Sequence, residues 1–290
     1  MQNIITDPPA IRSGTFNIGG DLMVVRLGFG AMRLTGKGVW GEPEDRNECI
    51  AVLRRAVELG ITFIDTADSY GPFVSERLIA EALYPYPENL VIATKAGLQR
   101  PGPDEWAPDG RTEHLRSRCE SSLQRLKLDR IDLFQLHRID TKVPLEDQIG
   151  VLLDLQNEGK VRHIGLSEVT VEQIATARRL AEIATVQNLY NLSDRRSEAV
   201  LDYCTRENIG FIPWFPLATG SLAGPSSPLS QAAKRLHATP GQVALAWLLG
   251  KSPVMLPIPG TSKVSHLESN AEAALLKIDE RLFRELERIV

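Results

Sequence analysis

Short apolar runs alternate with longer amphipathic segments along almost the whole chain, and this alternation restricts the fold more than any other feature. The apolar runs predict strands at 27–30, 62–65, 90–94, 131–137, 163–166, 185–187, 210–214 and 255–258. The amphipathic segments predict helices at 46–59, 75–83, 112–126, 145–158, 171–181, 197–207, 240–249 and 263–273. Eight strands alternating with eight helices over about 250 residues are typical of a (β/α)8 TIM barrel, so we predict this architecture of the α/β class.

Two elements are predicted outside the eight units. A β-hairpin signal covers 15–18 and 22–25 near the N-terminus, and an extra helix is predicted at 279–290 near the C-terminus. No linker divides the chain, so 1–290 is predicted to be a single domain, and disorder stays an open alternative for 1–14.

A doubly wound sheet is the competing α/β architecture, and it commonly carries a glycine-rich nucleotide-binding turn. The stretch 28–33 begins like that turn but has arginine at the position of the third glycine. A P-loop is excluded as well, because Ala31 stands where the first glycine should precede Gly36 and Lys37. These departures favour the barrel.

The charge of the chain limits its partners. Its 290 residues include 33 Lys and Arg against 37 Asp and Glu, a net charge of −4, whereas nucleic-acid binders usually present a basic face. No stretch approaches the ~20 apolar residues of a membrane span, and the start of the chain lacks a secretion signal. Three scattered cysteines indicate a reducing compartment, and five histidines show no metal-site spacing. We therefore expect a cytoplasmic protein with no metal and no nucleic-acid or membrane partner.

Polar side chains stand at the ends of five predicted strands, where barrels of this kind place their catalytic groups. They are Asp65, Tyr70, Lys95, His137, Ser167, Glu168 and Gln187. Singly, an aspartate there can cap a helix and a histidine can be structural. An acid, a phenol, an ammonium and an imidazole at one rim favour a joint site. Alternation from Ile131 through Gln135 also predicts that His137 points into the barrel mouth.

These residues resemble the catalytic tetrad of the aldo-keto reductases. Asp65 and Tyr70 have the spacing Asp-x4-Tyr. Lys95 lies in Ala-Thr-Lys-Ala-Gly, and His137 ends Leu-Phe-Gln-Leu-His. Further stretches of that family follow in the same order at 165–167, 187–191, 213–217 and 258–262, so the similarity covers about residues 25–270.

Within the family, the stretches 38–46 and 82–86 look most like the bacterial branch that includes pyridoxal reductases. The resemblance implies an oxidoreductase that reduces an aldehyde or ketone to an alcohol with a hydride from NADPH. Pyridoxal is then one candidate for the small-molecule carbonyl substrate.

The resemblance also implies a role for each member of the tetrad. Tyr70 is the proton donor, Lys95 and Asp65 tune it, and His137 orients the carbonyl. A free phenol has a pKa of ~10, so we expect the ammonium of Lys95 to favour the phenolate and make Tyr70 a stronger acid.

The resemblance assigns a second set of residues to the cofactor. Ser167, Glu168 and Gln187 would hold the nicotinamide carboxamide, although Glu168 stands where asparagine is usual, and Trp214 would stack on the ring. The pyrophosphate would lie along Leu217, Ala218, Gly220 and Ser221. The last strand end supplies Gly260, Thr261, Ser262, Lys263, His266 and Asn270.

A cationic helix start at Lys263 and His266 suits a 2′-phosphate, which favours NADPH over NADH. Asn270 would contact the adenine, but Ser269 replaces the glutamate that is common beside it.

The substrate pocket is expected to include Trp40, Phe73 and Trp106 as an aromatic wall, with Arg138 as a contact for a polar or anionic group. Two other functions stay open at this point. The same fold can serve as a regulatory NADPH-binding subunit with little turnover, as in the potassium-channel β subunits. A barrel can also use a lysine such as Lys95 as a Schiff base. The physiological substrate, the direction of the reaction and the oligomeric state are open as well.

Overall fold

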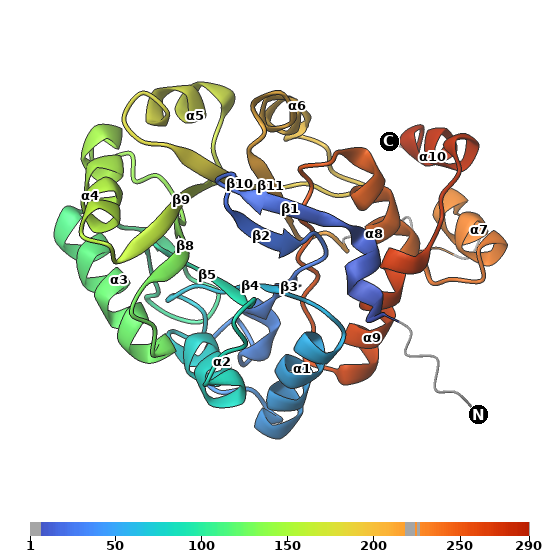
Figure 1. Ribbon diagram of the computed structural model, residues 1–290, viewed down its shortest axis with the longest axis horizontal. Helices are drawn as coiled ribbons and strands as arrows, with labels where there is room; N and C mark the ends of the chain where they lie inside the picture. The colour runs from blue at the N-terminus through green and yellow to red at the C-terminus, as the bar shows by residue number, and fades with distance from the viewer. Residues whose placement is uncertain (1–6, 218–223, 225–226, 290) are drawn as a thin grey trace.

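The computed structural model describes residues 7–217, 224 and 227–289. A ring of strands lies inside a ring of helices (Figure 1). Seven parallel strands form one sheet in the order β11-β10-β9-β8-β5-β4-β3. They are β3 (Phe29–Gly30), β4 (Phe63–Asp65), β5 (Val91–Ala96), β8 (Ile131–Leu136), β9 (Val161–Ser167), β10 (Ile183–Leu189) and β11 (Gly210–Trp214). Seven of the eight predicted strands are therefore present.

The eighth predicted strand, 255–258, is not a regular strand. Met255 makes one isolated parallel bridge with Phe211 of β11. On the other side, the Gly28 N–H donates to the Pro257 carbonyl at 2.9 Å. Proline has no N–H, so Pro257 and the proline two residues later cannot donate to a ladder. This extended segment nevertheless lies between β11 and β3 and closes the (β/α)8 barrel.

Glycine is required where the barrel closes. A Cβ added at Gly30 would lie 2.6 Å from the Ile258 carbonyl oxygen, and one at Gly260 would lie 2.5 Å from that of Gly30. The backbones of β3 and the closing segment could not approach this closely with larger residues.

The eight predicted helices are all present. They are α1 (Arg46–Glu58), α2 (Val74–Leu83), α3 (Thr112–Leu126), α4 (Leu145–Asn157), α5 (Val171–Ala177), α6 (Glu198–Glu207), α8 (Pro240–Lys251) and α9 (Val264–Glu272). Thr170 and Thr239 form capping boxes that fix the starts of α5 and α8. α5 is shorter than predicted, because the chain passes into turns after Ala177. No helix in the described part of the chain is long and apolar enough to cross a membrane.

Other elements decorate the barrel. The predicted hairpin, β1 (Thr15–Ile18) and β2 (Leu22–Val25), lies across the end of the ring and packs into its core (Figure 1). The extra C-terminal helix is α10 (Glu280–Glu287), and α7 (Pro228–Arg235) was not predicted. The loop after β5 contains the small unpredicted hairpin of β6 (Leu98–Gln99) and β7 (Ala107–Pro108).

Short 3-10 helices complete the fold: η1 (Pro9–Ser13), η2 (Ala31–Leu34) and η4 (Ala273–Leu275). In the segment 1–14, where disorder was an alternative, η1 is ordered and buries Ala10. Residues 1–6 lie outside the described residues.

Candidate active site

The structure brings the four predicted catalytic residues together at one end of the barrel. Asp65 ends β4, Tyr70 follows in the next loop, Lys95 lies in β5, and His137 follows β8. All four are buried. The Lys95 ammonium donates to Asp65 Oδ1 at 2.6 Å and to the Tyr70 hydroxyl at 3.3 Å. The carboxylate, ammonium and phenol therefore form one connected chain.

The carboxylate of Asp65 is fixed by two further donors. The side-chain amides of Gln135 in β8 and Gln187 in β10 each donate to Asp65 Oδ2 at 2.9 Å. Sequence reasoning did not assign Gln135 to the site, although its place in the alternation that leads to His137 was a usable signal. These two hydrogen bonds hold the Asp65 carboxylate in place beside Lys95.

Burial controls the protonation of His137. Its pKa lies well below the usual value, mainly because the ring is desolvated and then because Lys95, Arg138 and Arg100 are close. The imidazole is therefore neutral at neutral pH. Ser69 Oγ lies 3.2 Å from Nδ1, and the tautomer in which Ser69 donates carries its proton on Nε2.

The expected fall in the pKa of Tyr70 is not found. Burial raises this pKa above its usual value, while the charge of Lys95 opposes that rise only in part. The sequence showed that Lys95 would be close to Tyr70, but it did not show how deeply the Tyr70 hydroxyl would be buried. Tyr70 thus keeps its proton through the neutral range, as a proton donor must.

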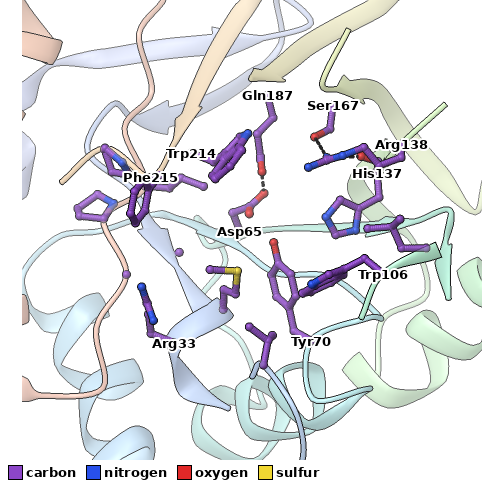
Figure 2. A pocket seen from close by; sticks show the side chains of 18 of the residues that line it. Arg33, Asp65, Tyr70, Trp106, His137, Arg138, Ser167, Gln187, Trp214 and Phe215 are labelled. Carbon is purple, nitrogen blue, oxygen red and sulfur yellow. Dashed lines mark hydrogen bonds between the residues drawn. The ribbon is translucent and has the colours of Figure 1, made fainter. Parts of the chain in front are cut away.

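Asp65, Tyr70 and His137 line a cavity of about 770 Å³, whereas the fully buried Lys95 is not among the described residues that line it. Figure 2 shows Tyr70, His137 and Trp106 on one side and Trp214 and Gln187 across from them. The rings of Tyr70 and His137 meet edge to face with 5.8 Å between centroids, and Trp106 packs similarly on both. A flat or small substrate could therefore reach the Tyr70 hydroxyl between aromatic walls.

Two of the four predicted substrate residues line this cavity, namely Trp106 and Arg138. Trp40 and Phe73 are not among the described residues that line it. Trp40 instead lies against the guanidinium of Arg100, with 5.6 Å between ring centroid and Cζ.

Phe73 has a left-handed backbone, with φ of 68°, which turns its ring toward Arg118 and Arg125. The two guanidinium groups attract the face of the Phe73 ring, and no pattern in the sequence indicated that pairing.

The cavity also has walls that the sequence did not predict. They come from the loop after β3 and from the β6–β7 hairpin: Met32, Arg33, Val39, Leu98, Asp104 and Pro108. Arg100 joins these loops, since its guanidinium donates to the carbonyls of Val39 and Ser69, each at 2.8 Å. The convergence of these loops depends on contacts between distant segments, for which the sequence carried no periodic signal.

The predicted cofactor residues divide into several groups. Ser167, Gln187, Trp214, Leu217 and Gly260 line the cavity, and Thr261 and Ser262 line an adjoining hollow of about 540 Å³. Lys263 and His266 are exposed at the start of α9, and Asn270 is buried on the same helix. Ala218, Gly220 and Ser221 lie outside the described residues.

The side chain of Glu168, which the resemblance assigns to the nicotinamide carboxamide, is bonded to other parts of the protein. Its carboxylate Oε1 accepts from the Trp214 indole N–H at 2.5 Å and from the Leu189 N–H at 2.7 Å. Glu168 is also absent from the described residues that line the cavity. The residue therefore fixes the Trp214 ring, an arrangement that the sequence could not indicate because the partner lies 46 residues away.

Asp68, in the loop between Asp65 and Tyr70, is a buried carboxyl outside the tetrad. Its Oδ1 has no hydrogen-bond partner among the described residues, and Arg118 approaches Oδ2 only to 3.7 Å. Burial, and then the nearby Glu76, raise the pKa of Asp68 to about 8. In the unfolded chain an aspartate ionises near pH ~4. At a pH between these two pKa values, Asp68 therefore takes up a proton when the chain folds. The free energy of unfolding that Asp68 contributes then falls as the pH rises toward 8.

We expect Asp68→Asn to remove this contribution to the pH dependence of stability. Between pH 5 and 8, the wild-type free energy of unfolding should fall more steeply than that of the variant, by up to about 1.4 kcal/mol per pH unit. Urea unfolding at several pH values measures both slopes. Parallel curves would contradict a protonated Asp68.

Comparisons with known proteins identify the family of this chain. The model of the Aldo/keto reductase family matches residues 26–290. The chain therefore belongs to the aldo/keto reductase family, and it is an oxidoreductase. It is 53% identical over 278 residues to an uncharacterized oxidoreductase of Schizosaccharomyces pombe, a match that covers 96% of this chain and 90% of that protein. It is 45% identical over 283 residues to the pyridoxine 4-dehydrogenase of Escherichia coli, covering 96% of this chain and 98% of that protein.

Solved structures show the same fold. The glycerol dehydrogenase of Gluconobacter oxydans superimposes with a TM-score of 0.86 at 26% identity, covering 96% of this chain and 95% of that one. An aldo-keto reductase of Klebsiella pneumoniae, solved in complex with NADPH, gives a TM-score of 0.81 at 26% identity and 94% coverage of both chains. The predicted barrel and family are thus confirmed.

Proposed function

We propose that this protein reduces an aldehyde or ketone to an alcohol with NADPH, with Tyr70 as the proton donor. The observation that carries the proposal is the chain from Asp65 through Lys95 to Tyr70, which ends beside neutral His137 in the cavity. A carbonyl oxygen there could accept hydrogen bonds from the Tyr70 hydroxyl and from His137 Nε2. When bound, NADPH would supply the hydride to the carbonyl carbon.

The cavity wall suits a nicotinamide. Ser167 and Gln187 are register neighbours on β9 and β10. Ser167 Oγ accepts from Arg138 at 3.0 Å, which leaves the Ser167 proton available to a carboxamide oxygen. Gln187 donates through Nε2 to Asp65, which leaves its Oε1 available to a carboxamide NH₂. With the Trp214 ring fixed by Glu168, these side chains complement a flat amide-bearing ring.

The tetrad moves one proton. Negative charge that develops on the carbonyl oxygen would be stabilised by the two donors, and Tyr70 would then deliver its hydroxyl proton to that oxygen. Lys95 lowers the cost of the resulting phenolate, and Asp65 keeps Lys95 charged and in place. Burial of the site keeps water from weakening these interactions.

The start of α9 supports a preference for NADPH over NADH. Lys263 and His266 are exposed cationic or titratable groups there, but Glu48 of α1 already accepts from the Val264 N–H at 3.0 Å. A 2′-phosphate would meet attraction from Lys263 and repulsion from Glu48.

We expect Lys263→Met to raise the Kd for NADPH about 5- to 10-fold, the size of a partly exposed charged hydrogen bond. NADH lacks the phosphate, so its Kd should not change and it serves as the internal control. Glu48→Gln should shift the NADPH value in the opposite direction. Fluorescence titration measures each Kd, and equal effects on both cofactors would contradict this placement of the phosphate.

The substrate class is proposed from the cavity and from a relative. The name of the Escherichia coli relative refers to pyridoxine, the alcohol related to pyridoxal. An aromatic cavity with the Arg138 guanidinium at its wall suits such a substituted ring. Steady-state oxidation of NADPH with pyridoxal, 4-nitrobenzaldehyde and a simple ketone tests the proposal. Turnover of at least one of them is expected, and failure of all three would count against the proposed reaction.

A further inference from the structure

Arg138 presents a guanidinium to the cavity that the protein itself satisfies only in part. Nη1 donates to the His137 carbonyl at 2.6 Å and to Ser167 Oγ at 3.0 Å. Figure 2 shows the side chain between His137 and Ser167, at the wall of the cavity. Among residues 7–217, 224 and 227–289, no protein atom accepts from its Nη2 or Nε.

The charge of Arg138 also has no direct partner. No carboxylate of the described residues lies within 4.0 Å of it, although ion pairs occur at many other places in the described part of the chain. Glu168 is near enough to act on the charge, but its Oε1 is bound by Trp214 and Leu189. Burial lowers the pKa of Arg138, as expected for a partly desolvated cation, yet a guanidinium remains charged at neutral pH. A cation held like this at a cavity wall is suited to an anion that enters the cavity.

The anion would lie close to the reacting carbonyl. Arg138 follows His137 directly in the chain and is bonded to its backbone, and both line the same cavity. A carbonyl oxygen at Tyr70 and His137 would therefore have the guanidinium beside it. On an aromatic aldehyde, an oxygen on the ring carbon ortho to the aldehyde group would lie next to the Arg138 guanidinium.

Resting on the proposed carbonyl reduction, we propose that Arg138 selects substrates that carry an anionic oxygen next to the reacting carbonyl. Ortho-hydroxy aromatic aldehydes in their ionised form are the class that fits the site. Arg138 would bind the phenolate through Nη2 or Nε while Tyr70 and His137 bind the aldehyde oxygen. Charge-assisted hydrogen bonds of this kind typically strengthen binding about 10-fold or more.

Three aldehydes on one ring test this selection: 3-hydroxypyridine-4-carbaldehyde, its 3-methoxy analogue and pyridine-4-carbaldehyde. They share the ring and the aldehyde, but only the first can place an anion beside it. For the wild-type enzyme we expect kcat/KM for the hydroxy compound to exceed that of the methoxy compound at least 10-fold, mainly through KM. Arg138→Met should reduce this ratio to near 1, and Arg138→Lys, which keeps the charge, should retain part of it.

The ratio separates substrate selection from other roles. If Arg138 served only to hold Ser167 or the cofactor, Arg138→Met would slow all three aldehydes alike and leave the ratio unchanged, which would overturn the inference. A wild-type ratio near 1 would overturn it too, while turnover of all three aldehydes would leave the proposed function standing. Failure of the wild type to reduce any of them would overturn the proposed function, and this inference with it.

Discussion

Tyr70→Phe is expected to lose about 10²- to 10⁴-fold in turnover, the range that general acid catalysis contributes. The substitution removes only the hydroxyl that Lys95 contacts at 3.3 Å, and it keeps the ring that packs on His137 and Trp106. Cofactor binding should persist, because Tyr70 is not one of the residues proposed to hold the nicotinamide. Turnover is measured by NADPH oxidation and cofactor affinity by fluorescence titration.

Tyr84→Phe provides the matched control. Tyr84 is 51% exposed at the end of α2, away from the cavity lining, so this variant should behave like the wild type. If Tyr70→Phe also turned over at nearly the wild-type rate, Tyr70 could not be the proton donor.

Lys95→Met should lower both activity and stability. Lys95 is fully buried and paired with Asp65 at 2.6 Å, so its removal leaves a buried carboxylate without its cation. Breaking one side of such a pair typically costs about 3–5 kcal/mol. Gln135 and Gln187 still donate to Asp65, so the lower part of that range is expected. Urea unfolding at neutral pH gives the loss.

The double variant Asp65→Asn with Lys95→Met separates the two effects. It removes both charges, so much of the stability should return. Turnover should remain low, because nothing would then favour the phenolate of Tyr70. A double variant with wild-type turnover would show that the charge of Lys95 is not needed for the chemistry.

The sequence predicted the regular part of the fold well and its irregular parts less well. Strands and helices follow from the alternation of apolar patterns, which is a local property. The closing segment at 255–258 was apolar enough to predict a strand, but Pro257 prevents a regular ladder. The helix α7 and the two-residue strands β6 and β7 were missed, since such short elements depend on tertiary contacts rather than on periodicity.

In the candidate site as well, the sequence predicted what depends on local pattern and missed what depends on tertiary contacts. The tetrad was predicted because its members stand at fixed offsets from strand ends. Trp40 and Phe73 were predicted to line the cavity but are not among its described lining residues, and their rings lie against arginines that the sequence pattern did not pair with them. Glu168 was assigned to the cofactor, but its side chain binds Trp214 on another strand. The pKa of Tyr70 depends on burial, which spacing alone does not reveal.

The proposed reduction depends on transfer of a hydride from NADPH to the carbonyl carbon, and isotope labelling follows that step. The enzyme is supplied with an aldehyde and with NADPH that carries deuterium at the transferable position of nicotinamide C4, and the alcohol is analysed by NMR. We expect one deuterium on the new carbinol carbon for each NADPH consumed. An alcohol without deuterium, or no consumption of NADPH with any aldehyde offered, would contradict it.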